Sequence, residues 1–326
     1  MTDLLAGYIG GSRVDLAQVD RKQGEIRLTG FQRFRPSDFK NLDSILELYL
    51  RKAKKEFSAV CLGVAGPVIK NKVTTTNLPW HISRTSIQKK FAFGEVKLIN
   101  DVVASAHGLA LLDQDKFFTI NEGTPEKNGN VGLMAAGSGL GQALIYTDGK
   151  AIYPYASEGG HSDFAPGSQL ETELWEYLYS ELGHVEVEDI ISLGGLERIY
   201  NFLVDTQGGV RSDWFEKASD RASAIIEKAL SGSDDTATQT LDIFIDCYAS
   251  EAANLALKGM TLGGIYITGM IAPRIITALD KGRFMERFVK KGKMEGMLKN
   301  IPVAVIIEER TALLGAASVA LGMQTQ

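Results

Sequence analysis

Two stretches of this chain repeat one unit, a strand, a glycine-rich turn and a returning strand, and this recurrence limits the fold strongly. The first unit covers residues 4–19, and the second covers residues 131–146. Glycine suits such turns because it adopts positive φ without steric cost. Alternating apolar residues at 25–34 extend the first unit into a β-meander. The recurrence predicts two related halves, each built on a sheet.

Strand-like and helix-like patterns alternate after the meander. Residues 41–55 place apolar side chains at helical spacing, whereas residues 59–65 and 96–99 are typical of buried strands. The later part of the chain is mostly helical, with two further strands expected at 264–267 and 303–307. This alternation predicts an α/β fold with mixed sheets flanked by helices, and 326 residues suffice for two domains.

Composition argues against several classes of protein. The net charge is −5 and no basic run is present, so a nucleic-acid partner is not expected. No apolar stretch reaches the roughly 20 residues of a membrane span, and the first residues do not resemble a signal peptide. Cys61 and Cys247 form no CxxC motif and lie in apolar sequence. We therefore expect buried thiols in a cytoplasmic protein without a membrane partner.

An apolar strand stops at Asn100 and Asp101, and a helix-like run begins directly after them. Polar residues where a strand ends and a helix begins often carry the chemistry of α/β enzymes. Asn and Asp are also preferred helix N-caps, and for these two residues taken alone capping is the preferred interpretation.

A second polar cluster contains Glu158, His161 and Asp163. These residue types are metal ligands, but the chain has no second Cys/His cluster and His184 stands alone, so no protein-bound metal is expected. The preferred interpretation is hydrogen bonding to a polyhydroxylated ligand, with the double glycine at 159–160 letting the ligand approach the backbone. A buried turn with satisfied polar groups is the alternative.

These stretches carry a resemblance that runs almost from end to end. The chain resembles bacterial glucokinases of the non-zinc type, in the hexokinase–actin superfamily. No cysteine-rich zinc motif of the other bacterial sugar-kinase branch is present. The matching motifs are Val64-Ala65-Gly66-Pro67-Val68, Thr76-Asn77-Leu78-Pro79-Trp80, Leu98-Ile99-Asn100-Asp101, Gly137-Ser138-Gly139-Leu140-Gly141, the stretch Ser157-Glu158-Gly159-Gly160-His161-Ser162-Asp163-Phe164-Ala165-Pro166, Gly263-Gly264-Ile265-Tyr266-Ile267, Ile271-Ala272-Pro273-Arg274 and Leu313-Leu314-Gly315-Ala316-Ala317.

The resemblance implies ATP-dependent phosphorylation of glucose to glucose 6-phosphate. Asp101 would be the general base that accepts the proton of the sugar 6-hydroxyl. Carboxylates and amides pair with sugar hydroxyls, and a pocket that pairs every hydroxyl rejects analogues lacking one. The implied glucose-binding residues are Asn100, Asp101, Glu158, His161 and Glu188.

The resemblance also implies ATP and Mg²⁺ as cofactors. The residues expected at the phosphates are Gly10, Gly11, Ser12, Gly137, Ser138, Gly139, Gly141 and Gly269. Tyr8 departs from the family pattern, because it stands where the family has an aspartate that helps to hold Mg²⁺. Arg13 and Asp15 depart as well, standing where the family usually has Asn and Arg. A second hypothesis is therefore a glucose-binding pseudokinase or sensor with an impaired ATP–Mg site.

The resemblance implies a two-domain hexokinase/actin-like (ribonuclease H-like) fold with a cleft between the domains. Residues 1–112 with 302–326 would form the small domain, and residues 113–301 the large one. Domain closure on sugar binding is implied too. The family is often dimeric, so a homodimer is an expected assembly.

Overall fold

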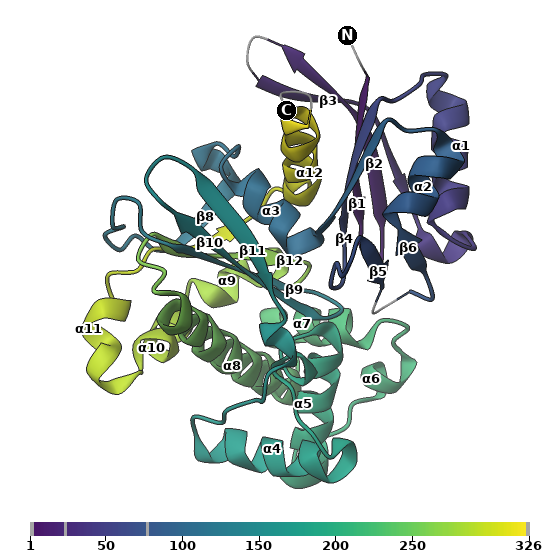
Figure 1. Cartoon of the computed structure of the whole chain (residues 1–326). Coiled ribbons are helices and arrows are strands. Elements are labelled where there is room, and N and C mark those ends of the chain that lie inside the picture. Colours follow the sequence, from purple (N-terminus) through teal and green to yellow (C-terminus); the bar gives the residue numbers. More distant parts are fainter. Residues whose placement is uncertain (1–2, 23–24, 76–77, 324–326) are drawn as a thin grey trace. The chain divides into compact units, whose positions relative to one another are not determined.

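The computed structural model describes residues 3–22, 25–75 and 78–323 (Figure 1). Of the motifs noted above, Thr76 and Asn77 lie outside the described residues. The chain divides into two compact units, described one after the other below. The first unit comprises Met1–Gln114, Pro154–Ala156 and Glu308–Gln326, and the second comprises Asp115–Tyr153 and Ser157–Ile307.

The first unit is built on a five-stranded mixed sheet in the order β3-β2-β1-β4-β7. Strands β1, β2 and β3 form an antiparallel meander, which confirms the predicted one, and β4 and β7 join it in parallel. The strands are β1 (Leu4–Ile9), β2 (Val14–Lys22), β3 (Glu25–Phe34), β4 (Ala59–Val64) and β7 (Glu95–Asn100), with a separate small hairpin of β5 (Lys72–Thr74) and β6 (His81–Ser83).

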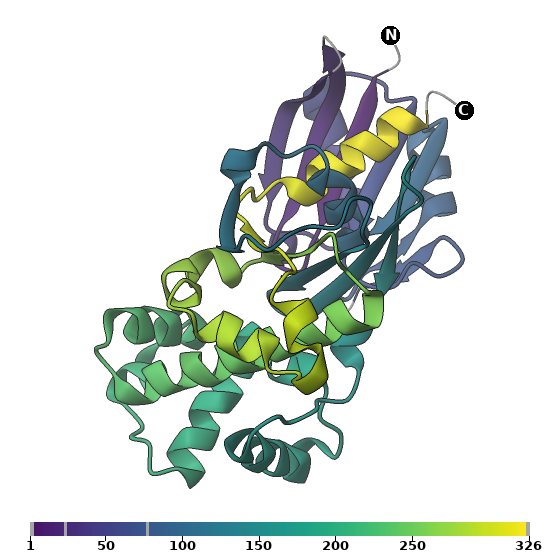
Figure 2. The ribbon, with the colours of Figure 1, turned by 90° about the vertical axis from the view of Figure 1, so that its left-hand side faces the viewer.

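Helices cover both faces of this sheet (Figures 1 and 2). Successive side chains of a strand point to opposite faces, so β1 contributes side chains to a hydrophobic core on each face of the sheet. Leu5 and Ile9 pack on the side of α1 and α2, and Leu4 and Ala6 pack on the side of α12. The helices of this unit are α1 (Leu42–Ala53), α2 (Arg84–Phe91), α3 (Asp101–Leu109) and α12 (Thr311–Gly322), with the short η1 (Pro36–Asp38).

Helices α3 and α12 approach each other closely because glycines line their contact. A Cβ atom at Gly315 would collide with the carbonyl oxygen of Ala104, and one at Gly108 would collide with the carbonyl oxygen of Thr311. Only glycine leaves room for backbone at this range. The small-residue stretch at the end of the chain therefore fastens the C-terminal helix to the helix that begins at Asp101.

The second unit is built on a six-stranded mixed sheet in the order β11-β10-β9-β12-β13-β8. The predicted second hairpin is confirmed, since β9 and β10 pair in antiparallel fashion. Strand β12 lies parallel to both β9 and β13, and β8 closes the other edge. The strands are β8 (Phe117–Asn121), β9 (Val131–Ala136), β10 (Leu140–Thr147), β11 (Ile152–Ser157), β12 (Gly264–Gly269) and β13 (Val303–Ile306).

Strand β13 belongs to this second unit because it pairs with β12 and β8. The division of the structure therefore falls after Ile307, several residues later than the expected boundary at residue 302.

A layer of helices packs on the second sheet around the long helix α8, which contacts β9 and β12. Helices α5, α7 and α10 pack in turn against α8. The helices of this unit are α4 (Gln169–Leu182), α5 (Leu193–Thr206), α6 (Asp213–Lys217), α7 (Arg221–Ser231), α8 (Asp235–Gly259), α9 (Ile276–Leu279), α10 (Arg283–Val289) and α11 (Glu295–Leu298), with η2 (Gln114–Lys116), η3 (Gly159–His161), η4 (Val187–Asp189), η5 (Ala272–Arg274) and η6 (Gly292–Met294).

Both cysteines are buried free thiols, as expected from their apolar surroundings. Burial raises the pKa of Cys61 to about 12 and raises that of Cys247 as well, so neither is a ready thiolate. Across the residues that the structure describes, no helix has the length and apolar character needed to cross a membrane.

Candidate active site

Three parallel strands of the first sheet end together and gather the predicted residues at one edge. Ile9 of β1 is the partner of Val64 in β4, and Val64 is the partner of Asn100 in β7. The glycine turn after β1 and the first residue of α3 therefore follow strand ends that lie in register. Carboxyl edges of this kind are the usual place for ligands in α/β folds.

Asn100 is the N-cap of α3, so the capping role considered for it is real. Its side-chain oxygen accepts hydrogen bonds from the backbone N–H of Val102 at 2.9 Å and of Val103 at 3.1 Å. Its amide nitrogen donates to the carbonyl of Gly66 at 3.3 Å. These bonds fix the junction between strand and helix. They also hold the neighbouring Asp101 at the start of the helix.

Asp101 is half-buried and occupies the first position of α3. One of its carboxylate oxygens accepts from the N–H of Val102 at 3.0 Å. The positive end of the helix dipole favours a negative charge at this position. The charge of Asp101 also acts on Tyr8. Burial is the main reason why the pKa of Tyr8 is raised, and the charge of Asp101 is the next largest cause. Tyr8 is therefore a neutral phenol beside an anionic carboxylate.

Tyr8 explains the glycine at position 10. A Cβ atom on Gly10 would collide with the Tyr8 hydroxyl, so the phenol lies directly against the turn. The N–H of Gly10 donates to the carbonyl of Arg13 at 2.9 Å and closes the hairpin. That donor is used within the turn, so Gly10 contributes space there, and its contact with a phosphate stays a prediction.

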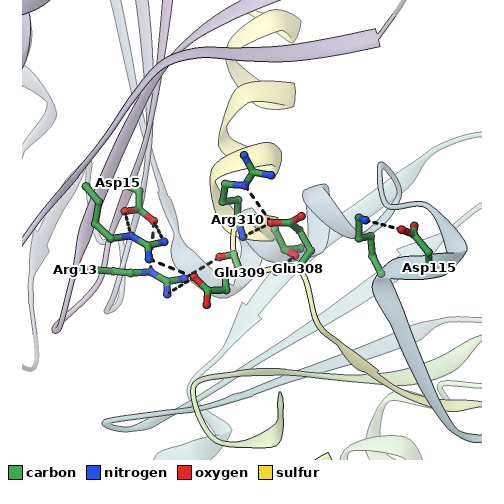
Figure 3. A network of polar contacts seen from close by, with 9 residues as sticks. Arg13, Asp15, Asp115, Glu308, Glu309 and Arg310 are labelled. Atoms are coloured by element: carbon green, nitrogen blue, oxygen red, sulfur yellow. Dashed lines mark hydrogen bonds and ion pairs between the residues drawn. The ribbon is translucent and has the colours of Figure 1, made fainter. Parts of the chain in front are cut away.

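Asp15, the cross-strand partner of Tyr8, forms ion pairs with two arginines (Figure 3). It is 1% exposed, and Arg33 donates to its two oxygens at 2.8 and 3.1 Å. The Arg13 Nε lies 3.4 Å from one of them. Arg13 also donates to the carbonyl of Glu309 at 2.8 Å and lies over the Tyr8 ring, 5.3 Å from its centre. Asp15 is thus neutralised within the protein.

The residues at this turn do not fit a directly coordinated Mg²⁺. Mg²⁺ prefers carboxylate and other oxygen ligands, yet Tyr8 is a neutral phenol and Asp15 is paired with Arg13 and Arg33. Within residues 3–22, 25–75 and 78–323, no group of three or more His, Cys, Asp or Glu side chains could hold a metal ion. No chemical step is therefore assigned to a metal held by this turn.

The second sheet repeats this arrangement of strand ends. Gly269, the last residue of β12, is the partner of Ala136, the last residue of β9. Gly269 has φ of 97°, and a Cβ atom there would collide with the Ala136 carbonyl. The turn after β9 closes when the N–H of Gly137 donates to the carbonyl of Gly139 at 2.8 Å. Ser138 and Gly139 thus lie at the same edge as Gly269.

Gly141 does not lie in this turn, although it was expected among the phosphate-binding residues. It is the second residue of β10 and the strand partner of Ala135. Gly141 therefore has a structural place in the pairing of β10 with β9, and its direct contact with a phosphate stays a prediction.

Glu188 touches the glycine turn of the second unit. One of its carboxylate oxygens accepts from the N–H of Leu140 at 2.7 Å. A Cβ atom at Gly139 would collide with this carboxylate, so the glycine is needed for their contact. A residue predicted to bind sugar therefore also holds the turn predicted to bind phosphate.

The double glycine after Glu158 packs against the protein itself. A Cβ atom at Gly160 would collide with the carbonyl of Leu140, and one at Gly159 would collide with the side chain of Gln142. The interpretation that these glycines make room for a ligand was wrong, because strand β10 already occupies that space. They set the position of η3 and of His161 at its end.

His161 lies among carboxylates. Its Nδ1 is 2.6 Å from a carboxylate oxygen of Glu186. That hydrogen bond is the main reason why the pKa of His161 is raised, and the charges of Glu188, Glu186 and Glu158 act in the same direction, whereas burial opposes them. The second unit thus brings together Glu158, His161 and Glu188, and the first unit holds Asn100 and Asp101.

Glu186 and His184 were not predicted as partners of the site. His184 does not stand alone: its Nε2 is 2.7 Å from Asp163 and its Nδ1 is 3.7 Å from Glu186. A signal was present in the sequence, since residues 184–188 alternate polar and apolar side chains. Val185 and Val187 are 2% exposed each, which turns the polar residues to the opposite face.

Comparison with known proteins gives a consistent result. The family model described as Glucokinase matches residues 5–323. A glucokinase from Nostoc punctiforme is 35% identical over 335 residues, covering 97% of this chain and 98% of the relative. The crystal structure of a glucokinase from an Antarctic psychrotroph has a TM-score of 0.84 at 30% identity and covers 99% of both chains.

A more distant structure shows the same fold. A ROK family glucokinase from Streptomyces griseus, solved in complex with glucose and AMPPNP, has a TM-score of 0.69 at 16% identity and covers 98% of this chain and 99% of its own. The expected hexokinase/actin-like fold class is therefore confirmed. Given a family model that spans nearly all of its residues and a 35% identical relative that matches almost from end to end, the chain belongs to the glucokinase family of sugar kinases.

Proposed function

We propose that this chain transfers the γ-phosphoryl group of ATP to the 6-hydroxyl of glucose and releases glucose 6-phosphate and ADP. The observation that carries the proposal is the placement of Asp101. Its half-buried carboxylate opens a helix at the carboxyl edge of a parallel strand set, where the helix dipole supports its charge. Such a group suits a general base.

In this proposal Asp101 accepts the proton of the 6-hydroxyl while that oxygen attacks the γ-phosphorus. The bond between the γ-phosphorus and its bridging oxygen breaks, and ADP leaves with the electron pair. Positioning and charge neutralisation dominate phosphoryl transfer. A general base contributes about 10²–10⁴ in rate, so Asp101 accounts for part of the acceleration and substrate placement for the rest.

Glucose would be recognised by hydrogen bonds from the polar residues predicted for the sugar. Glu158, His161 and Glu188 cluster in the second unit, and Asn100 and Asp101 adjoin each other in the first. Carboxylate acceptors together with an imidazolium donor suit several hydroxyls at once. Substrates that lack one of those hydroxyls would leave a site group unpaired and bind more weakly.

ATP would enter as its magnesium complex, with the ion held by phosphate oxygens. The relative from Streptomyces griseus supports the nucleotide, because it was solved with AMPPNP. The phosphates would lie by the glycine turns at residues 10–12 and 137–139. The N–H groups of Gly10 and Gly137 are already bonded within the turns, so the remaining residues of each turn would make the contacts.

The proposal is tested by incubating the full chain with glucose, ATP and Mg²⁺. We expect ADP release in a coupled assay and a glucose 6-phosphate signal in ³¹P NMR. Parallel reactions with ADP or polyphosphate as donor, and with other hexoses, define the substrates. The environment of Tyr8 favours the pseudokinase as the second candidate. Glucose binding in calorimetry without turnover by any donor would establish that candidate and overturn the proposal.

A further inference from the structure

Glu186 contacts the site but has no role in the reaction proposed above. It lies directly before η4, and its side chain is 32% exposed. Its backbone N–H donates to a carboxylate oxygen of Asp189 at 3.0 Å, and its carbonyl accepts from the N–H of Asp189 at 3.1 Å. This reciprocal pair fixes the backbone from which the Glu186 carboxylate extends.

A short antiparallel pairing of residues 162–164 with 185–187 places Glu186 beside His161. The N–H of Phe164 donates to Val185 at 2.9 Å, and the N–H of Val187 donates to Ser162 at 3.0 Å. Asp163 and Glu186 form the bridge between these two bonds. Opposed residues of such a pair share a face. The polar side chains therefore gather on one face, while the valines turn toward the core.

On that face, the Glu186 carboxylate lies between two imidazoles. One oxygen is 2.6 Å from Nδ1 of His161, and the other is 3.7 Å from Nδ1 of His184. His184 is held in turn by Asp163 at 2.7 Å. A carboxylate bonded to Nδ1 requires the ring proton on that atom, which settles the tautomer of a neutral imidazole. Nε2 of His161 is then the nitrogen left for a ligand.

We propose that Glu186 is a positioning residue of the sugar site: it binds Nδ1 of His161, fixes the orientation of the ring and leaves Nε2 to meet a sugar hydroxyl. The inference rests on the proposed function in one respect, the assignment of His161 to glucose. Carboxylates that orient a histidine through its second nitrogen act in this way in metal sites, and the same geometry serves a hydroxyl ligand.

The arrangement has a consequence for pH. The carboxylates that face His161 are Glu158, Glu186 and Glu188. Other titratable groups beside Glu186 are His184 and, across the bridge, Asp163. The raised pKa of His161 means that its imidazolium persists to higher pH than that of an ordinary histidine. An imidazolium donates from Nε2, whereas the neutral Nδ1–H tautomer can only accept there. The bond that His161 donates to a glucose hydroxyl is therefore lost, and glucose binding weakens, as pH rises through this pKa. Neutralising Glu186 moves that loss to lower pH.

The test compares Glu186→Gln with Glu176→Gln in the full-length protein. Glu176 is an exposed carboxylate of α4 and serves as the matched control. We expect Glu186→Gln to lower the pKa of His161 in an NMR titration, with the resonance assigned from His161→Gln. Loss of one charge-assisted hydrogen bond should also raise the KM for glucose about tenfold near neutral pH, with kcat changed much less.

Two results overturn the inference. One is a His161 titration in Glu186→Gln that matches the control, and the other is a KM that follows the control across the pH range. The titration needs no turnover, so it still decides the matter if the protein fails to phosphorylate glucose, in which case glucose-induced shifts of the His161 signal replace KM. Thermal unfolding of each variant checks that the fold is intact.

Discussion

Tyr8 and Asp15 show how the neighbour of a residue decides what that residue offers to a ligand. The family resemblance indicated that the carboxylate expected at position 8 is missing. It did not indicate that Asp15 is the cross-strand partner of Tyr8, nor that Arg33 donates two hydrogen bonds to Asp15. Those contacts join β2 and β3 across a turn, and they depend on a strand register that turn geometry and the buried face set together.

We expect Arg33→Ala to destabilise the first unit. The change leaves the buried carboxylate of Asp15 with Arg13 as its remaining cation, and a buried acceptor that loses its donors costs about 1–3 kcal/mol. Arg27→Ala is the matched control, since Arg27 is an exposed arginine on the same strand. Urea denaturation measures the two free energies of unfolding. Equal losses in both variants would show that the Asp15 pair contributes nothing beyond strand propensity.

Among the elements, those with local patterns were predicted and those set by long-range contact were not. The meander, the second hairpin and the helix at Asp101 follow from alternation, glycine turns and capping residues. The pairing of residues 162–164 with 185–187 was missed, because a helix and a turn separate the two segments. The alternation His-Val-Glu-Val-Glu at 184–188 indicates a short strand with one polar face. Its pairing partner, which only the structure shows, places that face beside Asp163.

The contact between α3 and α12 gives a prediction for Gly315→Ala. Alanine favours helices by about 1 kcal/mol over glycine, but a Cβ atom here collides with the carbonyl of Ala104. Overpacking of this kind costs about 1–3 kcal/mol or more, so we expect a lower melting temperature. Gly322→Ala lies in the same helix with open space around it and should be neutral or stabilising. If both variants melt alike, the close approach of the helices is not what requires the glycine.

At the scale of the whole molecule, the family resemblance was the strongest guide. It gave the fold class and the sugar-kinase assignment, both of which the comparisons support. It did not give the end of the second unit, because β13 is assigned by its pairing with β12 and β8 rather than by its place near the C-terminus. It also did not indicate which backbone groups at the expected phosphate site are available, since the N–H groups of Gly10 and Gly137 donate to carbonyls within their own turns.

The central claim is that Asp101 is the base of a glucose kinase, and Asp101→Asn tests it most directly. Asparagine keeps the size of the side chain and suits a helix start, so the fold should persist. We predict that turnover of glucose and ATP falls by about 10²–10⁴, while calorimetry still detects glucose binding. A variant that turns over as fast as the parent, with glucose binding unchanged, would contradict the account.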